Sequence, residues 1–381
     1  MIRTPAGIGD IRIKQFLDGY KSGYGVAVTA PVASVFSPIE LFAFGEQGGW
    51  YDPSDLSSLY QDSAGTTPVT AVEQFVGRMS DKSGQNNHLT QSVSGARPRL
   101  SARVNALVGT DTLSTQTADL TVVSVAGVTS NWTLQFSGAG TVTIGGVTYS
   151  AGVNTISITS TATLTVTVAG VVTEADLRPA DTGVNLPTYQ RVVSSTDYTT
   201  SGFPYYLRFD GAATWMETAN INPGNVSRAQ LFIGLRKLTS VQGMIVEFSN
   251  SFGVNNGVFN LQANATAINY FANSKGTANP GGASDVIASP NTAVLSGLFS
   301  ISDNGLVMRR NGSQTASNTA SQGTGNYLTY PLYVGARYST SRILFFSGNI
   351  YALAVRFSSG ALPLATISQM ESWVNGKTYA Y

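Results

Sequence analysis

The sequence predicts an all-β protein. From about residue 120 onward, short runs of β-branched and aromatic residues alternate with Gly, Asn and Ser turns, which is the spacing of a β-sandwich or barrel. Helix signals are scarce: one pattern spans 363–375, with Gly376 placed to stop it, and a shorter one spans 53–60, with Asp52 or Ser54 as its cap. Cysteine is absent, so packing must stabilise the fold without disulfides or thiolate metal sites.

The charge balance excludes several kinds of partner. The chain carries 22 basic and 21 acidic residues, and its net charge of +1 gives no long-range field for nucleic acid or an anionic membrane. Charged residues make up only 11%, against about 25% in typical proteins, so hydroxyl, amide and glycine groups must cover the surface. Such a surface is typical of extracellular or virion proteins. We find neither a membrane-spanning apolar run nor a signal peptide, and expect synthesis in the cytoplasm without export by that route.

The N-terminal region differs from the rest of the chain. Residues 1–44 contain an apolar stretch that Pro31 and Pro38 interrupt. This pattern predicts extended chain and isolated strands rather than a domain with its own core. We interpret residues 1–44 as an attachment segment whose apolar side chains cover a surface of this chain, a second copy or another protein.

Residues 106–193 form a Thr-, Val-, Ser- and Gly-rich segment. Hydroxyl and apolar residues alternate strictly over 163–168, which gives a strand one apolar and one hydroxyl face. We expect a small antiparallel sandwich here. Trp132 alternates with Leu134 and Phe136, so we assign its ring to the core of that sandwich rather than to sugar stacking.

The residues on either side of this segment carry an ordered set of motifs. The turn DKSGQNNH (81–88) precedes a strand that ends in Arg97-Pro98. After the segment come YYLRFDGAATWMETANI, AQLFIGLRKL, the "NG" turn of NGLVMRRNGSQTAS, and FFSGNIYALAVRFSS with the final helix. In this order the motifs resemble the laminin-G-like (concanavalin A-like lectin/glucanase) domains of bacteriophage tail and receptor-binding proteins, over about 46–104 and 203–381.

The resemblance implies a discontinuous domain. A concanavalin A-like jelly-roll sandwich is made of 45–105 and 194–381, and 106–193 interrupts it as a smaller β-sandwich similar to the carbohydrate-binding-like modules of other phage tail proteins. The implied function is that of a virion tail protein, at a fibre, tip or baseplate, which binds a host-surface glycan or other receptor. Residues 1–44 would dock to other tail or baseplate proteins, and proteins of this kind are frequently trimers. A purely structural tail or capsid-decorating role and a polysaccharide depolymerase are the alternatives.

Catalytic groups are sparse. Laminarinase-type enzymes of this fold place paired carboxylates on one strand, about 5 Å apart, whereas the matching strand here offers only Glu247. We interpret this lone carboxylate as structural. His88 is the single histidine, and we expect its ring to hydrogen-bond the backbone of the turn 81–87 rather than to serve a triad or a metal. The sequence therefore predicts a protein that is not an enzyme.

Three loops have the aromatic and amide content that grips sugars: 249–257, 269–282 and 335–342. The candidate ligand-binding residues in them are Asn255, Tyr270, Phe271, Asn273, Arg337 and Tyr338. The other tryptophans sit in apolar patterns, and we expect burial between the sheets for Trp50, Trp215 and Trp373.

Calcium is the one cofactor that the resemblance allows, because relatives of this fold often hold one ion through Asp, Asn and backbone oxygens. The candidate ligands are Asp81, Asp210, Asn255 and Asn256. They form no compact Asp-rich loop, so we assign no metal ligand.

Overall fold

The computed structural model describes residues 36–121, 130–158, 163–180, 182–264 and 269–381. Most of the predicted attachment segment therefore lies outside the described residues. Its end forms the 3-10 turn η1 (Pro38–Phe42), where Leu41 and Phe42 are buried. The Nε of Arg356, on strand β25 (Ser347–Ser358), donates to the carbonyl of Leu41 at 2.7 Å, which packs this turn against the sheet.

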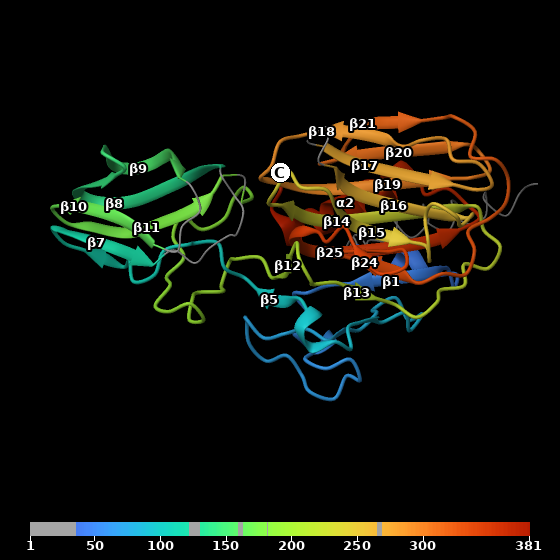
Figure 1. The fold of residues 1–381 in the computed structure, drawn as a ribbon, viewed down its shortest axis with the longest axis horizontal. Coiled ribbons are helices and arrows are strands. Elements are labelled where there is room, and N and C mark those ends of the chain that lie inside the picture. Colours follow the sequence, from blue (N-terminus) through green and yellow to red (C-terminus); the bar gives the residue numbers. More distant parts are fainter. Residues whose placement is uncertain (1–35, 122–129, 159–162, 181, 265–268) are drawn as a thin grey trace, which may run out of the picture. The chain divides into compact units, whose positions relative to one another are not determined.

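Two antiparallel sheets form the larger part of the fold (Figure 1). The eight-stranded sheet runs in the order β21 (Ser313–Asn318), β20 (Gly305–Arg310), β19 (Asn291–Ser300), β14 (Arg228–Lys237), β25, β12 (Tyr206–Asp210) and β5 (Arg99–Ser101), with β1 (Gln47–Tyr51) also paired to β25. Because β1 and β5 precede the Thr-rich segment and their partners follow it, both halves of the chain build one sheet.

The nine-stranded sheet is assembled in the same way. Its order is β18 (Ala283–Val286), β17 (Asn269–Lys275), β16 (Val258–Asn264), β15 (Gly243–Phe248), β22 (Leu332–Val334), β13 (Met216–Glu217), β4 (Leu89–Thr90), β3 (Arg78–Met79) and β2 (Leu59–Tyr60). Strands β2 to β4 come from before the Thr-rich segment. A separate hairpin, β23 (Arg337–Tyr338) and β24 (Arg342–Ile343), follows β22.

The inner faces of the two sheets share one core. The ring of Phe259 on β16 stacks on Phe299 of β19 with centroids 5.0 Å apart, and Phe248 on β15 lies 4.7 Å from Phe357 on β25. Each such pair adds about 0.5–1.5 kcal/mol beyond the burial of its rings. The predicted fold class, an all-β jelly-roll sandwich of the concanavalin A-like type, is confirmed.

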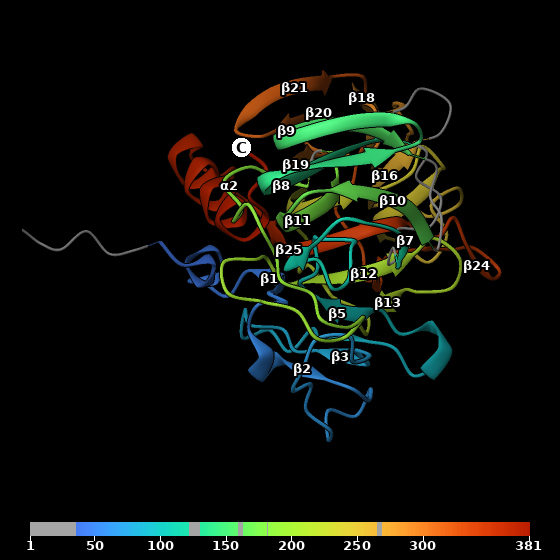
Figure 2. The ribbon, with the colours of Figure 1, turned by 90° about the vertical axis from the view of Figure 1, so that its left-hand side faces the viewer.

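One long helix, α2 (Leu364–Thr378), lies on the outer face of the eight-stranded sheet, where it contacts β14, β19 and β25 (Figure 2). Gly234 on β14 permits the close approach, because a Cβ there would lie 1.9 Å from Thr378 Oγ1. The predicted helix is confirmed, but its stop is wrong: the helix continues through Gly376 to Thr378, and Tyr379, whose φ is +54°, is its C-cap. Within the part of the chain that the structure describes, no helix has both the length and the apolar character needed to cross a membrane.

The second predicted helix, 53–60, is wrong. Asp55 caps only the short 3-10 turn η2 (Leu56–Ser58), and Tyr60 then pairs with Arg78 in the nine-stranded sheet. Cross-strand pairing with a segment 18 residues away outweighs the local helical preference.

The segment between β5 and β12 has its own core. Its six strands are β6 (Thr112–Leu113), β7 (Gln116–Thr121), β8 (Ser130–Ile144), β9 (Val147–Ile158), β10 (Thr163–Ala169) and β11 (Val172–Pro179). The pairing of the long β8 with β9 shifts register between Phe136 and Thr141, and at Gly138 in this stretch a Cβ would lie 2.5 Å from the carbonyl oxygen of Val171. Trp132 is fully buried in this core, as predicted. Along β10, Val166 and Val168 are buried and the threonines are exposed, which confirms the predicted alternation.

Candidate functional site

A continuous row of polar side chains crosses the outer face of the nine-stranded sheet. Each member is the direct register partner of the next, from β2 to β17: Tyr60, Arg78, Thr90, Glu217, Tyr333, Glu247, Asn260 and Asn273. Their strand neighbours, such as Met216, Phe248 and Phe259, belong to the core, so the row occupies the opposite face. Seven inter-strand spacings of about 4.8 Å make this polar row about 34 Å long.

The half of the polar row that lies on strands β22, β15, β16 and β17 is buried, although it faces away from the core. Tyr333, Glu247, Asn260 and Asn273 are each at most 5% exposed. Parts of the three predicted loops meet over this half around Phe252. Two cations lie against its ring, Arg337 at 5.6 Å and Lys275 at 5.3 Å, and the Nζ of Lys275 also donates to the carbonyl of Gly253.

Glu247 is the charged centre of the polar row. Arg337 donates to its Oε2 through Nε and Nη2, both at 2.7 Å. Burial raises the pKa of Glu247 to about 7, although the charge and hydrogen bonds of Arg337 oppose this. Through Arg337, Glu247 anchors the β23–β24 hairpin to the sheet. Its place in a row of polar side chains was not predicted.

Three neighbouring strands each present a buried oxygen without a hydrogen-bond partner among the described residues. These atoms are Glu247 Oε1, Asn260 Oδ1 and Asn273 Oδ1. The amide nitrogen of Asn273 is used, since it donates to Asn279 Oδ1 at 3.1 Å. A buried acceptor left unpaired costs about 1–3 kcal/mol, so this part of the row is suited to a partner that brings donors.

The adjoining part of the polar row carries an aromatic platform, which we define as Trp215, Tyr333 and Tyr338 around the guanidinium of Arg342. The Cζ of Arg342 lies 3.8, 4.2 and 4.6 Å from the three ring centroids, in that order. Its Nη2 also pairs with Glu217 at 2.6 Å, while its Nη1 is buried without a partner among the described residues. The platform therefore packs three rings around one guanidinium, whose Nη1 has no partner among the described residues.

The expected burial of three tryptophans between the sheets is wrong. Trp215 is half-buried in the aromatic platform. Trp50 and Trp373 pack edge to face at 5.7 Å, between β1 and α2 on the outer side of the eight-stranded sheet. Apolar neighbours in the sequence indicated burial but could not indicate which face of the sheet each ring would occupy.

His88 behaves as predicted. The backbone N–H of Asp81 donates to its Nδ1 at 3.0 Å. Burial, with the nearby charge of Arg78, lowers the pKa of His88, so the neutral ring holds the turn that leads into β4.

The six predicted ligand-binding residues divide into two groups. Asn273 belongs to the polar row, and Arg337 and Tyr338 lie over it. Asn255 shapes its own loop, because its Oδ1 accepts from the backbone N–H of Ser251 at 2.6 Å.

The remaining two candidates lie on β17, which is a strand rather than the predicted loop. Alternation sends Tyr270 into the core, where it is fully buried and donates to Asn291 Oδ1 at 3.1 Å. Phe271 points to the other face and is half-buried next to Gly282. Tyr270 has no surface to offer a ligand.

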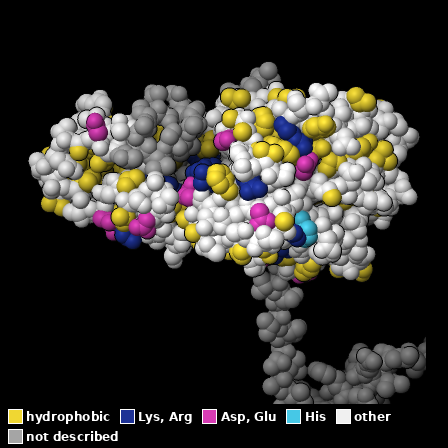
Figure 3. Space-filling model, turned by 60° about the horizontal axis from the view of Figure 1, so that its bottom comes forward, with side chains coloured by type: hydrophobic (Ala, Val, Ile, Leu, Met, Phe, Trp, Pro, Cys, Tyr) yellow, Lys and Arg dark blue, Asp and Glu magenta, His cyan; other side chains and the backbone are white. Residues whose placement is uncertain are grey.

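Three of the four candidate calcium ligands, Asp81, Asp210 and Asn255, accept hydrogen bonds from the backbone. Asp81 Oδ1 accepts from the N–H groups of Trp50 and Ser83, and Asp210 Oδ1 accepts from those of Ala212 and Ala213. The described residues contain no group of three or more acidic or histidine side chains that could hold a metal ion. On the face drawn in Figure 3, acidic and basic side chains are interspersed and neither sign forms an extended area.

No protein-family model matches this chain, and no curated protein matches its sequence. Solved structures with a similar fold include a heptameric SAP-like pentraxin from Limulus polyphemus, at 14% identity and a TM-score of 0.35, covering 42% of this chain and 78% of the pentraxin. Botulinum neurotoxin type C is similar at 8% identity and a TM-score of 0.33, and the similarity covers 45% of this chain and 43% of the toxin chain. The CBM40 of Ruminococcus gnavus IT-sialidase, bound to α2,3-sialyllactose, is similar at 11% identity and a TM-score of 0.29. This similarity covers 39% of this chain and 96% of the CBM40 chain. At these values the similarities concern the fold alone.

Proposed function

We propose that this chain is a non-catalytic glycan-binding protein that holds an extended polysaccharide across the polar row. The supporting observation is the set of three adjacent acceptors, Glu247 Oε1, Asn260 Oδ1 and Asn273 Oδ1, beside the aromatic platform. The loops around Phe252 cover these acceptors, so the proposal requires that those loops move aside when the polysaccharide binds. Sugar hydroxyls donate hydrogen bonds to such acceptors, and the C–H face of a sugar ring packs on aromatic side chains. A row that crosses eight strands suits a long ligand better than a single sugar.

Substitution of Asn260 separates binding from stability. Asn260→Ala removes an unpaired acceptor, so the melting temperature should stay the same or rise, while polysaccharide affinity falls about fivefold for one lost hydrogen bond of about 1 kcal/mol. Glycan-array screening would identify the polysaccharide, and co-sedimentation would give the affinities. Gln314→Ala, on the exposed strand β21 of the other sheet, is the matched control. Equal affinity of wild type and Asn260→Ala would contradict the proposal.

The place of action in this proposal is a bacteriophage tail. Its support is the ordered resemblance of 46–104 and 203–381 to tail and receptor-binding proteins, together with the weakly charged, cysteine-free composition. Repeated copies in a particle would add avidity to weak single sites. Electron microscopy of particles with this chain labelled tests it. An outward-facing sandwich at a tail tip or fibre would support adhesion, and a sandwich enclosed by several neighbours would favour the purely structural alternative.

Polysaccharide cleavage is the second candidate. Glu217 and Glu247 both pair with Tyr333, so their Cα atoms lie about 10 Å apart and both side chains lie on the same face of the sheet. Inverting glycosidases use two carboxyl groups on either side of the scissile bond. A pKa near 7 also suits a general acid, but each carboxylate already engages an arginine. Release of reducing ends from a bound polysaccharide, abolished by Glu247→Gln, would favour cleavage over binding alone.

A further inference from the structure

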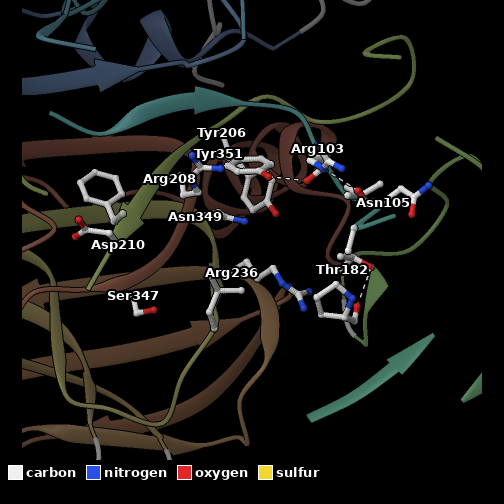
Figure 4. Close-up of a pocket in the computed structure, with 15 residues that line it drawn as sticks. Arg103, Asn105, Thr182, Tyr206, Arg208, Asp210, Arg236, Ser347, Asn349 and Tyr351 are labelled. Carbon is white, nitrogen blue, oxygen red and sulfur yellow. Dashed lines mark hydrogen bonds between the residues drawn. The ribbon is translucent and has the colours of Figure 1, made fainter. Parts of the chain in front are cut away.

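A buried lysine, Lys237, lies between the two sheets at the end of β14. Arg236, the residue before it, lines a cavity on the outer face of the eight-stranded sheet together with Asn349 (Figure 4). Alternation along β14 therefore turns Lys237 to the inner face. Lys237 is only 1% exposed, and its Nζ donates to the carbonyl of Ile287 at 3.0 Å.

The surroundings of Lys237 favour its neutral form. Burial lowers the pKa of Lys237 to about 8, and the charge of Asp285 opposes this shift only in part. At pH 7, about one in ten lysines with such a pKa carries no charge. A neutral amine is a nucleophile, and a lysine that burial holds partly neutral is an activated one. Lys237 is therefore a buried nucleophile.

An amide lies directly opposite this lysine. Asn291 on β19 is the register partner of Lys237, so the two Cβ atoms lie about 4.5–5.5 Å apart on the same face of the sheet. Both side chains also meet the phenol of Tyr270. The Nζ of Lys237 lies 4.7 Å from the ring centroid, and the Tyr270 hydroxyl donates to Asn291 Oδ1 at 3.1 Å. The flexible side chain of Lys237 can cover the remaining distance to the amide carbon by rotating about its own bonds.

The hydroxyl of Tyr270 activates the Asn291 amide. A hydrogen-bond donor on a carbonyl oxygen stabilises the negative charge that develops there when a nucleophile attacks the carbon. Tyr270 is fully buried, and burial raises the pKa of its hydroxyl, so this donor keeps its proton. The charged groups beside the ring are Asp285, which is the register partner of Tyr270, and Arg310, which pairs with Asp285 at 2.6 Å.

We propose that Lys237 and Asn291 form an intramolecular isopeptide bond that joins β14 to β19. The Nζ of neutral Lys237 attacks the Cγ of Asn291, and the Tyr270 hydroxyl stabilises the negative charge on Oδ1. The Nζ–Cγ bond forms, the Cγ–Nδ2 bond breaks, and one proton passes from Nζ to Nδ2, which leaves as ammonia. The reaction consumes no oxidant or other reactant.

The bond closes residues 238–290 into a covalent loop. Such a loop restricts the unfolded chain in the way that a disulfide does. This chain has no cysteine and therefore no disulfide of its own.

The mass of the denatured full chain tests the proposal, because the linked chain is lighter than its sequence by one molecule of ammonia. Trypsin should not cut after Lys237, and tandem mass spectrometry should find a branched peptide that contains Lys237 and Asn291. Lys237→Gln should restore the full mass. Lys82→Gln, the same change at a partly exposed lysine on a surface turn, is the matched control and should keep the loss.

Two further measurements complete the test. Tyr270→Phe keeps the ring but removes the donor, so bond formation during incubation at pH 9 should be about a hundredfold slower than in wild type. Hydroxylamine treatment separates the isopeptide bond from cyclic imides at Asn-Gly sequences such as Asn311-Gly312, which also lose ammonia but are cleaved by hydroxylamine.

A wild-type chain that has its full sequence mass, and keeps it after incubation at pH 9, would overturn the proposal without the need for any variant to fold. Loss of ammonia that persists in Lys237→Gln would overturn it as well. Neither result bears on polysaccharide binding by the polar row.

Discussion

The protonation of Glu247 makes the stability of the sandwich depend on pH. The pKa of this carboxyl is about 7 in the folded chain, because the side chain is fully buried, against an ordinary value of 4.5. The folded state therefore binds more protons than the unfolded state between these values, and the free energy of unfolding falls as pH rises through the interval. At about 1.4 kcal/mol per pH unit, the full contribution is about 3 kcal/mol.

Glu247→Gln removes this titration while keeping the shape of the side chain. The free energy of unfolding of wild type should fall by up to about 3 kcal/mol more than that of Glu247→Gln between pH 4.5 and 7.5. Urea denaturation followed by tryptophan fluorescence measures it, since Trp50, Trp215 and Trp373 lie in the sandwich. Parallel stability curves for the two proteins over this range would refute the reasoning.

Three further substitutions test separate parts of the fold. Arg342→Lys keeps the charge but removes the planar guanidinium between the rings of the aromatic platform, so polysaccharide affinity measured by co-sedimentation should fall about tenfold. An unchanged affinity would contradict a role of the aromatic platform in binding. Gly234→Ala forces a Cβ against Thr378, so it should lower the free energy of unfolding by about 1–3 kcal/mol, which a lower melting temperature would show. An unchanged melting temperature would mean that α2 can shift to make room for the added methyl group. Trp132→Ala should lower the free energy of unfolding of the inserted segment by about 3–5 kcal/mol, so urea unfolding should separate into two transitions. A single transition would show that the inserted segment and the sandwich unfold together.

Local alternation in the sequence predicted much of the fold. The threonine–apolar pattern of β10 and the burial of Trp132 follow from a period of two residues, which any strand must have. The same period explains the error at Tyr270: once 269–275 is a strand, Tyr270 and Asn273 must point to opposite faces. Treating this stretch as a loop concealed that difference.

The polar row itself could not be read from the sequence. Glu217, Tyr333 and Glu247 become neighbours only through register between strands that lie far apart in the chain. By alternation, a glutamate between the buried Val246 and Phe248 lies on the face opposite the core. Its partner Arg337 lies 90 residues away, and no local pattern links the two.

Strand β25 has a consequence for how this chain is made. It pairs with β1, β12 and β14 and follows every other described strand in the chain, so the middle of the eight-stranded sheet cannot form until β25 has left the ribosome. Until then, the first strands have no partner at that position, whereas residues 106–179 can close their own core during synthesis. Shortening the chain to end before Ser347 should therefore yield a folded inserted segment attached to a sandwich that never assembles.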